Sequence, residues 1–458
     1  MQSTLNKIQM KKNKLLLKEG CIITMNQTLQ VLRHTDILIE NDKISAIAPE
    51  LNIEDCQIIP AAGKIVMPGF VDSHRHVWES PLKGIAAEYS LMQYLQHILG
   101  PLAASYRPED VFVANLYGAL EALDAGITTI FDWSHIMNTP AHADAAITGL
   151  MAAGGRAVFG YGTPGTAVWD WFYESRLKHP GDIERICKEY FSSQRQLITP
   201  AMAIRGPEYS LFNVSRDDIN LARSLCLPVS MHVGCGAFAS KYKAIERLDS
   251  AGLLGPDMNF AHCNYLDSHD FEKLAANGCS ISITPEVEMQ MGIGFPATGK
   301  ALAAGIAPAL GIDVITATSG DMFTQMRIAL QTQRAFANAE ILNAGEMPQN
   351  VSLTTIDVLK MATINGARAL NLAETTGSLE PGKQADIIML DAGMLNLSPV
   401  NDPVATVVSQ ANISNIDTVI VAGKIVKANH KLLYQGFDGV KHRLENSAAH
   451  LLEQALVI

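Results

Sequence analysis

Long uninterrupted apolar runs are missing from this 458-residue sequence. The first apolar run, Leu15–Leu17, leads directly into Lys18 and Glu19, so it is too short and too polar at its flank for a signal peptide. No stretch has the continuous hydrophobicity that a membrane-spanning helix needs. These absences predict a cytoplasmic protein that has no membrane partner.

Paired cysteines and an excess of positive charge are also lacking. The seven cysteines are scattered and form no Cys-x-x-Cys pair, so we expect reduced thiols that are mostly buried. Acidic residues outnumber basic ones by 46 to 35, which gives a net charge of −11 and predicts no nucleic-acid partner, because such a partner would be repelled. We expect the one basic cluster, Lys7, Lys11, Lys12 and Lys14, to be a solvated tail.

The composition that remains is that of a large folded chain. The hydrophobic fraction is 48% and the charged fraction 18%, which excludes a disordered or fibrous protein. Residues 1–66 and 371–436 contain short strand-like runs with tight turns, and we expect them to form one small β-sandwich domain together. Residues 437–458 are expected to be a helical tail, and residues 67–370 a separate, larger domain.

Within residues 67–370, eight apolar runs alternate with longer helical patterns. This alternation and the length of the region favour the α/β class and, within it, a (β/α)₈ (TIM) barrel over an open sheet. A clear helix is expected from Asp321 to Asn338, with Thr318 and Asp321 at the spacing of a capping box. The candidate strands are Met67–Asp72, Thr128–Asp132, Ala157–Tyr161, Leu197–Ile204, Pro228–His232, Asn259–His262, Ser280–Thr284 and Ala307–Gly311.

Histidines and one aspartate stand at the ends of several of these strands. His74 and His76 are two residues apart, so their rings point to the same side of a strand and can reach one metal ion. His232 and His262 close two later strands, and Asp313 follows another. The carboxyl ends of barrel strands converge on one mouth. Four imidazoles and one carboxylate there predict a single divalent ion, Zn²⁺ or alternatively Fe²⁺, rather than calcium or magnesium.

The order of these motifs resembles that of the amidohydrolase superfamily, in particular its branch of cytosine deaminases, guanine deaminases and triazine hydrolases. The resemblance implies a barrel with a β-sandwich, one metal ion, hydrolysis of a ring substituent or a cyclic C–N bond, and, as in many members, a homodimer. The segment from Leu197 to Arg205 has no lysine, where branches with two metals usually carry a carboxylated one. The motifs that carry the resemblance are Pro68–His76, Gly126–Asp132, Leu310–Asp313, Ala362–Leu370 and Gly377–Asp386.

One position departs from the deaminase pattern. Deaminases of this branch usually have His-x-x-Glu at the fifth strand, and that glutamate carries protons between the water and the ring or leaving group. Here His232 is followed by Val-Gly-Cys235, so a cysteine takes the place of the glutamate. Cys235 is interpreted either as a small packing residue or as a thiol that a nearby cation deprotonates.

Three catalytic arrangements remain open at this point. In the first, Asp313 is the only general base on the metal-activated water and His262 orients the nucleophile. In the second, Glu286 or Glu288 replaces the missing glutamate; in the third, the chain is a catalytically silent scaffold. The predicted function is hydrolytic deamination of a small nitrogen heterocycle by a metal-dependent hydrolase. Opening of a lactam and dehalogenation are alternatives on the same scaffold.

Six residues that follow strand ends are candidates for substrate contacts. Aromatic side chains at the mouth can stack on a flat heterocycle, although each can equally pack a loop. The candidates are Trp78 and Glu79 after the first strand, Trp133 and His135 after the second, and Arg205 and Glu208 after the fourth.

Overall fold

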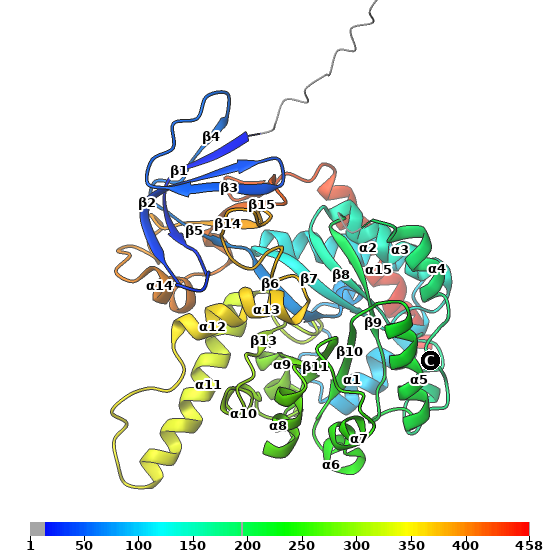
Figure 1. Cartoon of the computed structure of the whole chain (residues 1–458). Helices are drawn as coiled ribbons and strands as arrows, with labels where there is room; N and C mark the ends of the chain where they lie inside the picture. The colour runs from blue at the N-terminus through cyan, green and yellow to red at the C-terminus, as the bar shows by residue number, and fades with distance from the viewer. Residues whose placement is uncertain (1–13, 194–195, 458) are drawn as a thin grey trace, which may run out of the picture.

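The computed structural model describes residues 14–193 and 196–457. They form a barrel of parallel strands beside a mixed sheet built from both ends of the chain (Figure 1). Lys7, Lys11 and Lys12 lie outside the described residues, so the predicted solvated tail stays a prediction; Lys14 begins strand β1.

The barrel consists of eight parallel strands, in the order in which they occur in the sequence. It closes between the first strand and Asp313, because the Asp313 N–H donates to the His74 carbonyl (2.8 Å) and the His76 N–H donates to the Asp313 carbonyl (3.0 Å). The predicted barrel is therefore confirmed. Its strands are β6 (Phe70–Arg75), β7 (Ile127–Ser134), β8 (Arg156–Tyr161), β9 (Ile198–Ala203), β10 (Val229–Val233), β11 (Met258–His262), β12 (Ser280–Ile283) and β13 (Ala309–Leu310).

The predicted first strand, Met67–Asp72, is wrong in its start. Met67 and Pro68 belong to β5 (Lys64–Pro68), which pairs with β14 (Ile387–Asp391) of the terminal sheet. The chain crosses to the barrel at Gly69, where a Cβ atom would lie 2.1 Å from the Thr128 hydroxyl oxygen. Only a residue without a side chain fits this crossing.

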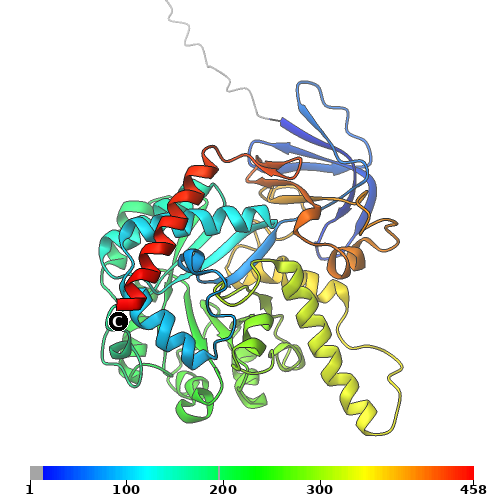
Figure 2. The same cartoon turned by 180° about the vertical axis from the view of Figure 1, so that it is seen from behind.

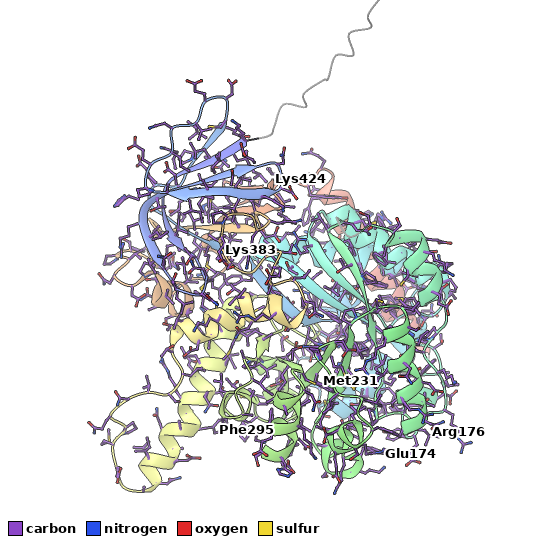
Figure 3. All side chains as sticks on the ribbon, in the orientation of Figure 1. Glu174, Arg176, Met231, Phe295, Lys383 and Lys424 are labelled. Carbon is purple, nitrogen blue, oxygen red and sulfur yellow. The ribbon has the colours of Figure 1, made fainter. Side chains whose placement is uncertain are left out.

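The terminal sheet has nine strands contributed by both chain ends and encloses its own apolar core. In Figure 3, Lys383 and Lys424 mark this domain and Met231 marks the barrel. The predicted β-domain made of both ends is confirmed. Besides β5 and β14, its strands are β1 (Lys14–Ile23), β2 (Val31–Glu40), β3 (Lys43–Ala48), β4 (Gln57–Pro60), β15 (Ile416–Val421), β16 (Lys424–Ala428) and β17 (Lys431–Leu432).

Helices surround the barrel (Figures 1 and 2). The principal ones are α2 (Pro108–Asp124), α3 (Pro140–Ala153), α4 (Ile183–Tyr190), α5 (Phe212–Ser224), α7 (Ala244–Ser250), α8 (Ser268–Ala276), α10 (Thr298–Ala303), α11 (Met322–Asn343), α12 (Thr355–Met361) and α13 (Ile364–Ala369). Helix α14 (Pro403–Ser409) lies beside the terminal sheet and contacts β1, α11 and α12. Shorter elements at the mouth are η1 (Val77–Leu82), α1 (Leu91–His97), η2 (Ile98–Leu102), η3 (Val168–Trp171), α6 (Phe238–Tyr242) and α9 (Pro285–Gln290), and η4 (Ile413–Asn415) precedes β15.

Helix α11 differs from the prediction in its end and its cap, and the C-terminal helix packs against elements of the mouth. Helix α11 runs five residues beyond the predicted end, and its cap is Asp321, whose carboxylate accepts the Thr324 N–H (2.8 Å), so the capping box with Thr318 is wrong. The C-terminal helix α15 (Phe437–Val457) lies across α2 and contacts η1 and η2 (Figure 2). No helix in the described part of the chain is long and apolar enough to span a membrane.

Candidate active site

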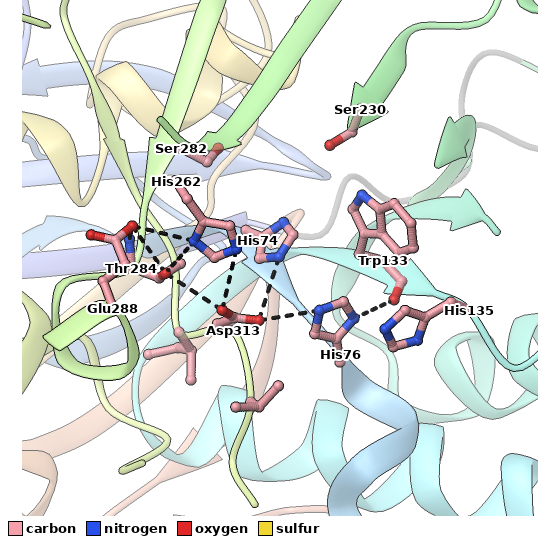
Figure 4. Close-up of polar contacts among 12 residues, drawn as sticks. His74, His76, Trp133, His135, Ser230, His262, Ser282, Thr284, Glu288 and Asp313 are labelled. Carbon is pink, nitrogen blue, oxygen red and sulfur yellow. Dashed lines mark hydrogen bonds and ion pairs between the residues drawn. The ribbon is translucent and has the colours of Figure 1, made fainter. Parts of the chain in front are cut away.

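The five predicted metal ligands meet at the carboxyl end of the barrel. Figure 4 shows four of them, His74, His76, His262 and Asp313. Ligand atoms of His74, His76 and His232 lie within 4.8 Å of one another, and so do those of His74, His262 and Asp313. The two groups share His74, which places all five side chains around one point. Strand alternation explains His74 and His76, and the convergence of barrel strands explains the other three.

Asp313 is the centre of this cluster. Its Oδ1 lies 3.1 Å from His76 Nε2 and 3.5 Å from His74 Nε2, and its Oδ2 lies 3.6 Å from His262 Nε2. Burial alone would raise the pKa of Asp313, but the adjacent imidazoles of His74, His76 and His262 favour the ionised form and hold that pKa well below its usual value. The side chain is therefore a carboxylate, able to bind a cation or accept a proton.

The ring of His74 fits an ion better than any role in packing. The side chain is fully buried, and neither ring nitrogen has a hydrogen-bond partner among the described residues. Burial lowers the pKa of His74 to about 4, so the ring is neutral and one nitrogen keeps its lone pair. An unsatisfied buried imidazole is costly, and a divalent cation would satisfy it.

The other rings are oriented by their second nitrogens. His76 Nδ1 lies 2.7 Å from the Trp133 carbonyl oxygen, and His262 Nδ1 lies 3.1 Å from Thr284 Oγ1 and 3.3 Å from Glu288 Oε1. These contacts direct Nε2 of both rings toward Asp313 (Figure 4). Such partners are typical of metal-binding histidines. Glu288 is fully buried and thus supports a ligand instead of facing substrate.

Backbone strain is concentrated at the same place. His262 and Asp313 have φ values of 77° and 69°, in the left-handed region that residues with side chains seldom adopt. Next to them, a Cβ atom on Gly311 would lie 2.8 Å from the Cβ atom of His74. The surrounding barrel holds these residues in a costly conformation, as is common at functional sites.

The position of the missing glutamate faces the cavity. Cys235 lines it, and burial raises the pKa of its thiol well above the usual value, so the thiol is neutral. Directly behind, Glu208 Oε1 accepts the Gly234 N–H (2.8 Å), while its Oε2 is buried without a partner in the described chain. Burial raises the pKa of Glu208 to about 7. A carboxyl group therefore exists near Cys235, but it does not line the cavity.

Glu286 contacts helix α11 and the segment that precedes it. Its carboxylate accepts hydrogen bonds from Ser319 Oγ (2.9 Å) and Gln325 Nε2 (2.9 Å). It does not line the cavity. Of the two carboxylates weighed as replacements for the glutamate, one supports a metal ligand and the other helps to anchor helix α11.

A partly open cavity lies above the ligands, and its wall combines apolar and aromatic side chains with a few polar groups, as is typical of small-molecule sites. Arg205 is its only cationic side chain outside the histidines. The guanidinium lies over the Phe172 ring (4.6 Å) and forms no hydrogen bond or ion pair with any described residue. Burial lowers the pKa of Arg205 to about 10, so the group is still charged at neutral pH.

Of the six candidate substrate residues, His135 and Arg205 line the cavity and the other four lie behind its wall. The Trp78 indole donates to His135 Nδ1 (3.0 Å). Glu79 accepts hydrogen bonds from the hydroxyls of Tyr94 and Thr316. The Trp133 ring packs on His232, with 4.4 Å between ring centroids.

Most residues of the outer wall were not predicted from the sequence as site residues. These residues are apolar or aromatic, and their spacing in the sequence is that of ordinary core residues. They are Leu91, Tyr94, Leu95, Leu99, Phe172, Tyr209, Met291, Ile293 and Val314. The spacing of Leu91, Leu95 and Leu99 predicts a buried helix face, but nothing in it distinguishes a cavity wall from a packed core.

Comparison with known proteins agrees with this geometry. A 5-methylthioadenosine/S-adenosylhomocysteine deaminase of Thermococcus kodakarensis is 30% identical over 426 residues, 90% of this chain and 93% of the relative. A 5′-deoxyadenosine deaminase of Methanobrevibacter smithii is 28% identical over 434 residues, 92% and 94% of the two chains. These relatives confirm the predicted class of reaction, metal-dependent hydrolytic deamination of a heterocycle, and they do not favour a silent scaffold.

Solved structures share the fold. A zinc-bound adenosine deaminase from Xanthomonas campestris superposes with a TM-score of 0.84 at 23% identity, covering 96% of this chain and 99% of the other. A zinc complex of atrazine chlorohydrolase from Arthrobacter aurescens gives 0.83 at 20% identity, covering 95% and 100%. The Amidohydrolase family profile matches residues 65–426, the whole barrel and most of the terminal sheet's C-terminal half. The predicted resemblance is thus confirmed, and the chain belongs to the amidohydrolase family.

Proposed function

We propose that this amidohydrolase is a zinc-dependent deaminase of adenine nucleosides that carry a modified 5′ position. The observation that carries the proposal is the convergence of His74, His76, His232, His262 and Asp313 at the floor of the cavity. The relatives named above act, by their names, on 5′-deoxyadenosine, 5-methylthioadenosine and S-adenosylhomocysteine.

Zinc is the proposed ion because neutral imidazole nitrogens and a single carboxylate suit its borderline-soft character. When bound, the ion would act as a Lewis acid and supply a nucleophilic water at neutral pH. His74, His76, His232 and His262 would hold it together with Asp313. Metal analysis of the purified protein checks this assignment: about one zinc per chain is expected, and iron in its place would contradict the choice of metal.

The proton transfers are assigned to Asp313. Its carboxylate is ionised, so it can accept a proton from the attacking water and return it to the amine that leaves as ammonia. His262 stays in position because Thr284 and Glu288 hold its Nδ1, so its Nε2 side faces the reacting centre. The neutral thiol of Cys235 borders the ring without taking over the role of a carboxylate.

Arg205 is proposed to bind an oxygen-rich or anionic part of the substrate. A buried guanidinium without a hydrogen-bond or ion-pair partner in the described chain carries a desolvation cost that a ligand can offset. Bidentate hydrogen bonding to a carboxylate would satisfy two of its donors at once. Among substrates of the relatives, S-adenosylhomocysteine has such a carboxylate and 5′-deoxyadenosine does not.

The test is ammonia release from adenosine, 5′-deoxyadenosine, 5-methylthioadenosine and S-adenosylhomocysteine by the zinc-loaded protein. Arg205→Met should raise KM for the carboxylate-bearing nucleoside about 30-fold or more and for the others only a few-fold. Arg205→Lys keeps the charge and should recover part of the loss. Deamination that is absent for all four nucleosides would overturn the proposed substrate class; equal effects of Arg205→Met on all four would overturn the role of Arg205 alone.

A second candidate function is displacement of a better leaving group, such as halide, from a heterocycle. The neutral Cys235 thiol favours it, because a halide leaves without the proton that an amine needs. The same protein assayed for chloride release from chlorinated triazines distinguishes the two. Chloride release with no ammonia release would replace the first proposal by the second.

A further inference from the structure

His135 is held in the cavity wall in an unusual way. It follows strand β7, is 3% exposed, and stacks flat on His76 with 4.2 Å between ring centroids and 2° between planes (Figure 4). It is absent from both groups of potential metal ligands found in the described chain. The ring therefore lies beside the metal centre without taking part in it, and it lines the cavity.

A hydrogen bond from Trp78 determines where His135 carries its proton. The Trp78 indole Nε1 lies 3.0 Å from His135 Nδ1. An indole N–H can only donate, so His135 Nδ1 must be the acceptor and must hold a lone pair. A neutral imidazole whose Nδ1 accepts carries its hydrogen on Nε2. A protonated ring would place two N–H groups against each other, so this contact also keeps the ring neutral.

Trp78 is itself fixed in place. Its ring is fully buried and meets the Tyr106 ring edge to face at 5.1 Å. Its carbonyl oxygen accepts the Tyr106 hydroxyl at 3.0 Å. The donor cannot turn away from His135 without losing this packing, so the tautomer is set by the fold.

The remaining nitrogen is the functional one. In the described residues His135 Nε2 has no hydrogen-bond partner, and the ring borders the cavity. The other polar groups of the described wall are the Arg205 cation, two tyrosines, the Cys235 thiol and the predicted metal ligands His76, His232, His262 and Asp313. A fixed neutral N–H at this place recognises an acceptor atom and rejects a ligand that presents a hydrogen there.

We propose that His135 determines specificity by donating its Nε2–H to an acceptor atom of the heterocycle, a ring nitrogen or a carbonyl oxygen, and that Trp78 is the positioning residue that fixes this tautomer. The inference rests on the proposed deamination, since it concerns how the same ring is bound. The opposing explanation is that His135 only packs against His76.

The first experiment reads the tautomer without any turnover. The zinc-loaded protein, labelled with ¹⁵N-histidine, is examined by NMR, and His135→Gln assigns the His135 signals. We expect a protonated Nε2 and an unprotonated Nδ1 in the wild type, and averaged signals in Trp78→Phe, which removes the donor. A proton on Nδ1 in the wild type would overturn the proposal even if deamination is observed.

The second experiment tests recognition. His135→Met removes the donor and should raise KM roughly 10- to 100-fold while kcat changes less, and His135→Gln, which retains an N–H donor, should recover most of the loss. Deaza analogues in which one ring nitrogen is replaced by C–H supply the matching deletion on the ligand. One of them, used as a competitive inhibitor, should bind the wild type more weakly than the parent compound does, by about the same factor as the loss in His135→Met. The affinity of His135→Met should be the same for this analogue and for the parent compound.

Two outcomes separate the inference from the function on which it rests. If no substrate is turned over, the proposed function fails, and the NMR spectrum and inhibitor affinities still decide the role of His135. Suppose instead that turnover occurs, that KM rises equally in His135→Gln and His135→Met, and that every deaza analogue loses the same affinity relative to its parent compound in the wild type and in His135→Met. His135 then only packs against His76. Thermal unfolding of each variant verifies that it is folded before these comparisons are made.

Discussion

The two ends of the cavity are built on different principles. At the inner end, buried polar groups at and just after the strand ends face one another: Asp313 faces three imidazoles, and Glu288 and Thr284 support His262. At the outer end, apolar side chains such as Leu95 and Met291 come from loops and short helices. The inner end thus fixes the chemistry on a rigid scaffold, whereas the outer end selects the molecule that reaches it.

The strongest test of this comparison removes the charge at the centre of the inner end. Asp313→Asn deletes both a ligand atom and the proton acceptor, so kcat should fall about 10³-fold or more. Zinc content should fall as well, measured by mass spectrometry of the metal. The control is Asp217→Asn, at the surface in an ion pair with Lys178 (2.8 Å), which should leave both quantities unchanged. Retained activity in Asp313→Asn would contradict the assignment of Asp313 as the general base.

A smaller effect is expected one step away from the ion. Glu288→Gln keeps the shape of the side chain but weakens its hold on His262 Nδ1. Partners of metal-binding histidines typically contribute 10- to 100-fold, so we expect a loss of about that size in zinc affinity or in kcat/KM. Competition with a chelator measures the affinity. If Glu288→Gln changes neither quantity, the inner end does not depend on its supporting groups and the contrast with the outer end weakens.

The inner end is also the part that the sequence reveals. His74 and His76 are identified by the two-residue period of a strand, and His232, His262 and Asp313 by their places at strand ends, because both rules are local. The local sequence does not indicate which of Glu286 and Glu288 supports His262. Both lie on helix α9, and only the packing of Ser319 and Gln325 around Glu286 separates them.

The fold shows the same division between local and non-local information. The alternation of strands and helices predicts the barrel, yet Met67 pairs with β14, more than 300 residues away, and so belongs to the terminal sheet. Thr318 has the spacing of a cap, but Asp321 caps helix α11 itself. The Trp78–His135 contact could not be predicted, because it depends on how η1 packs against the end of β7.

Asp218 is a buried carboxylate outside the metal site, and it lacks the neighbouring imidazoles that favour the ionised form of Asp313. Asp218 accepts one backbone N–H, from His179 (3.0 Å), and burial raises its pKa to about 6. A folded-state pKa above the unfolded value means that stability is lost as pH rises through about 6. Asp218→Asn cannot ionise, so its stability relative to the wild type should increase by about 1 kcal/mol between pH 5 and pH 7.5.

Urea unfolding at the two pH values measures that difference, with Asp217→Asn, at a neighbouring half-buried position, as the control. The pH-dependent gain should be seen only for the buried position. A gain that is absent, or one of opposite sign, would mean that Asp218 ionises at little cost and that buried carboxylates outside the metal end are better compensated than their contacts indicate.

The smallest effect is expected at the outer end, where shape rather than charge is at issue. Met291→Leu nearly conserves volume, so it should shift the ratio of KM values between two nucleosides about two- to fivefold and leave kcat and zinc content unchanged. Met289→Leu is the matched control, since Met289 is 36% exposed and does not line the cavity. Steady-state kinetics on both nucleosides gives the ratio. A loss of zinc or a tenfold fall in kcat in Met291→Leu would show that the two ends are coupled through helix α9, which carries Glu288 and whose C-cap is Met291.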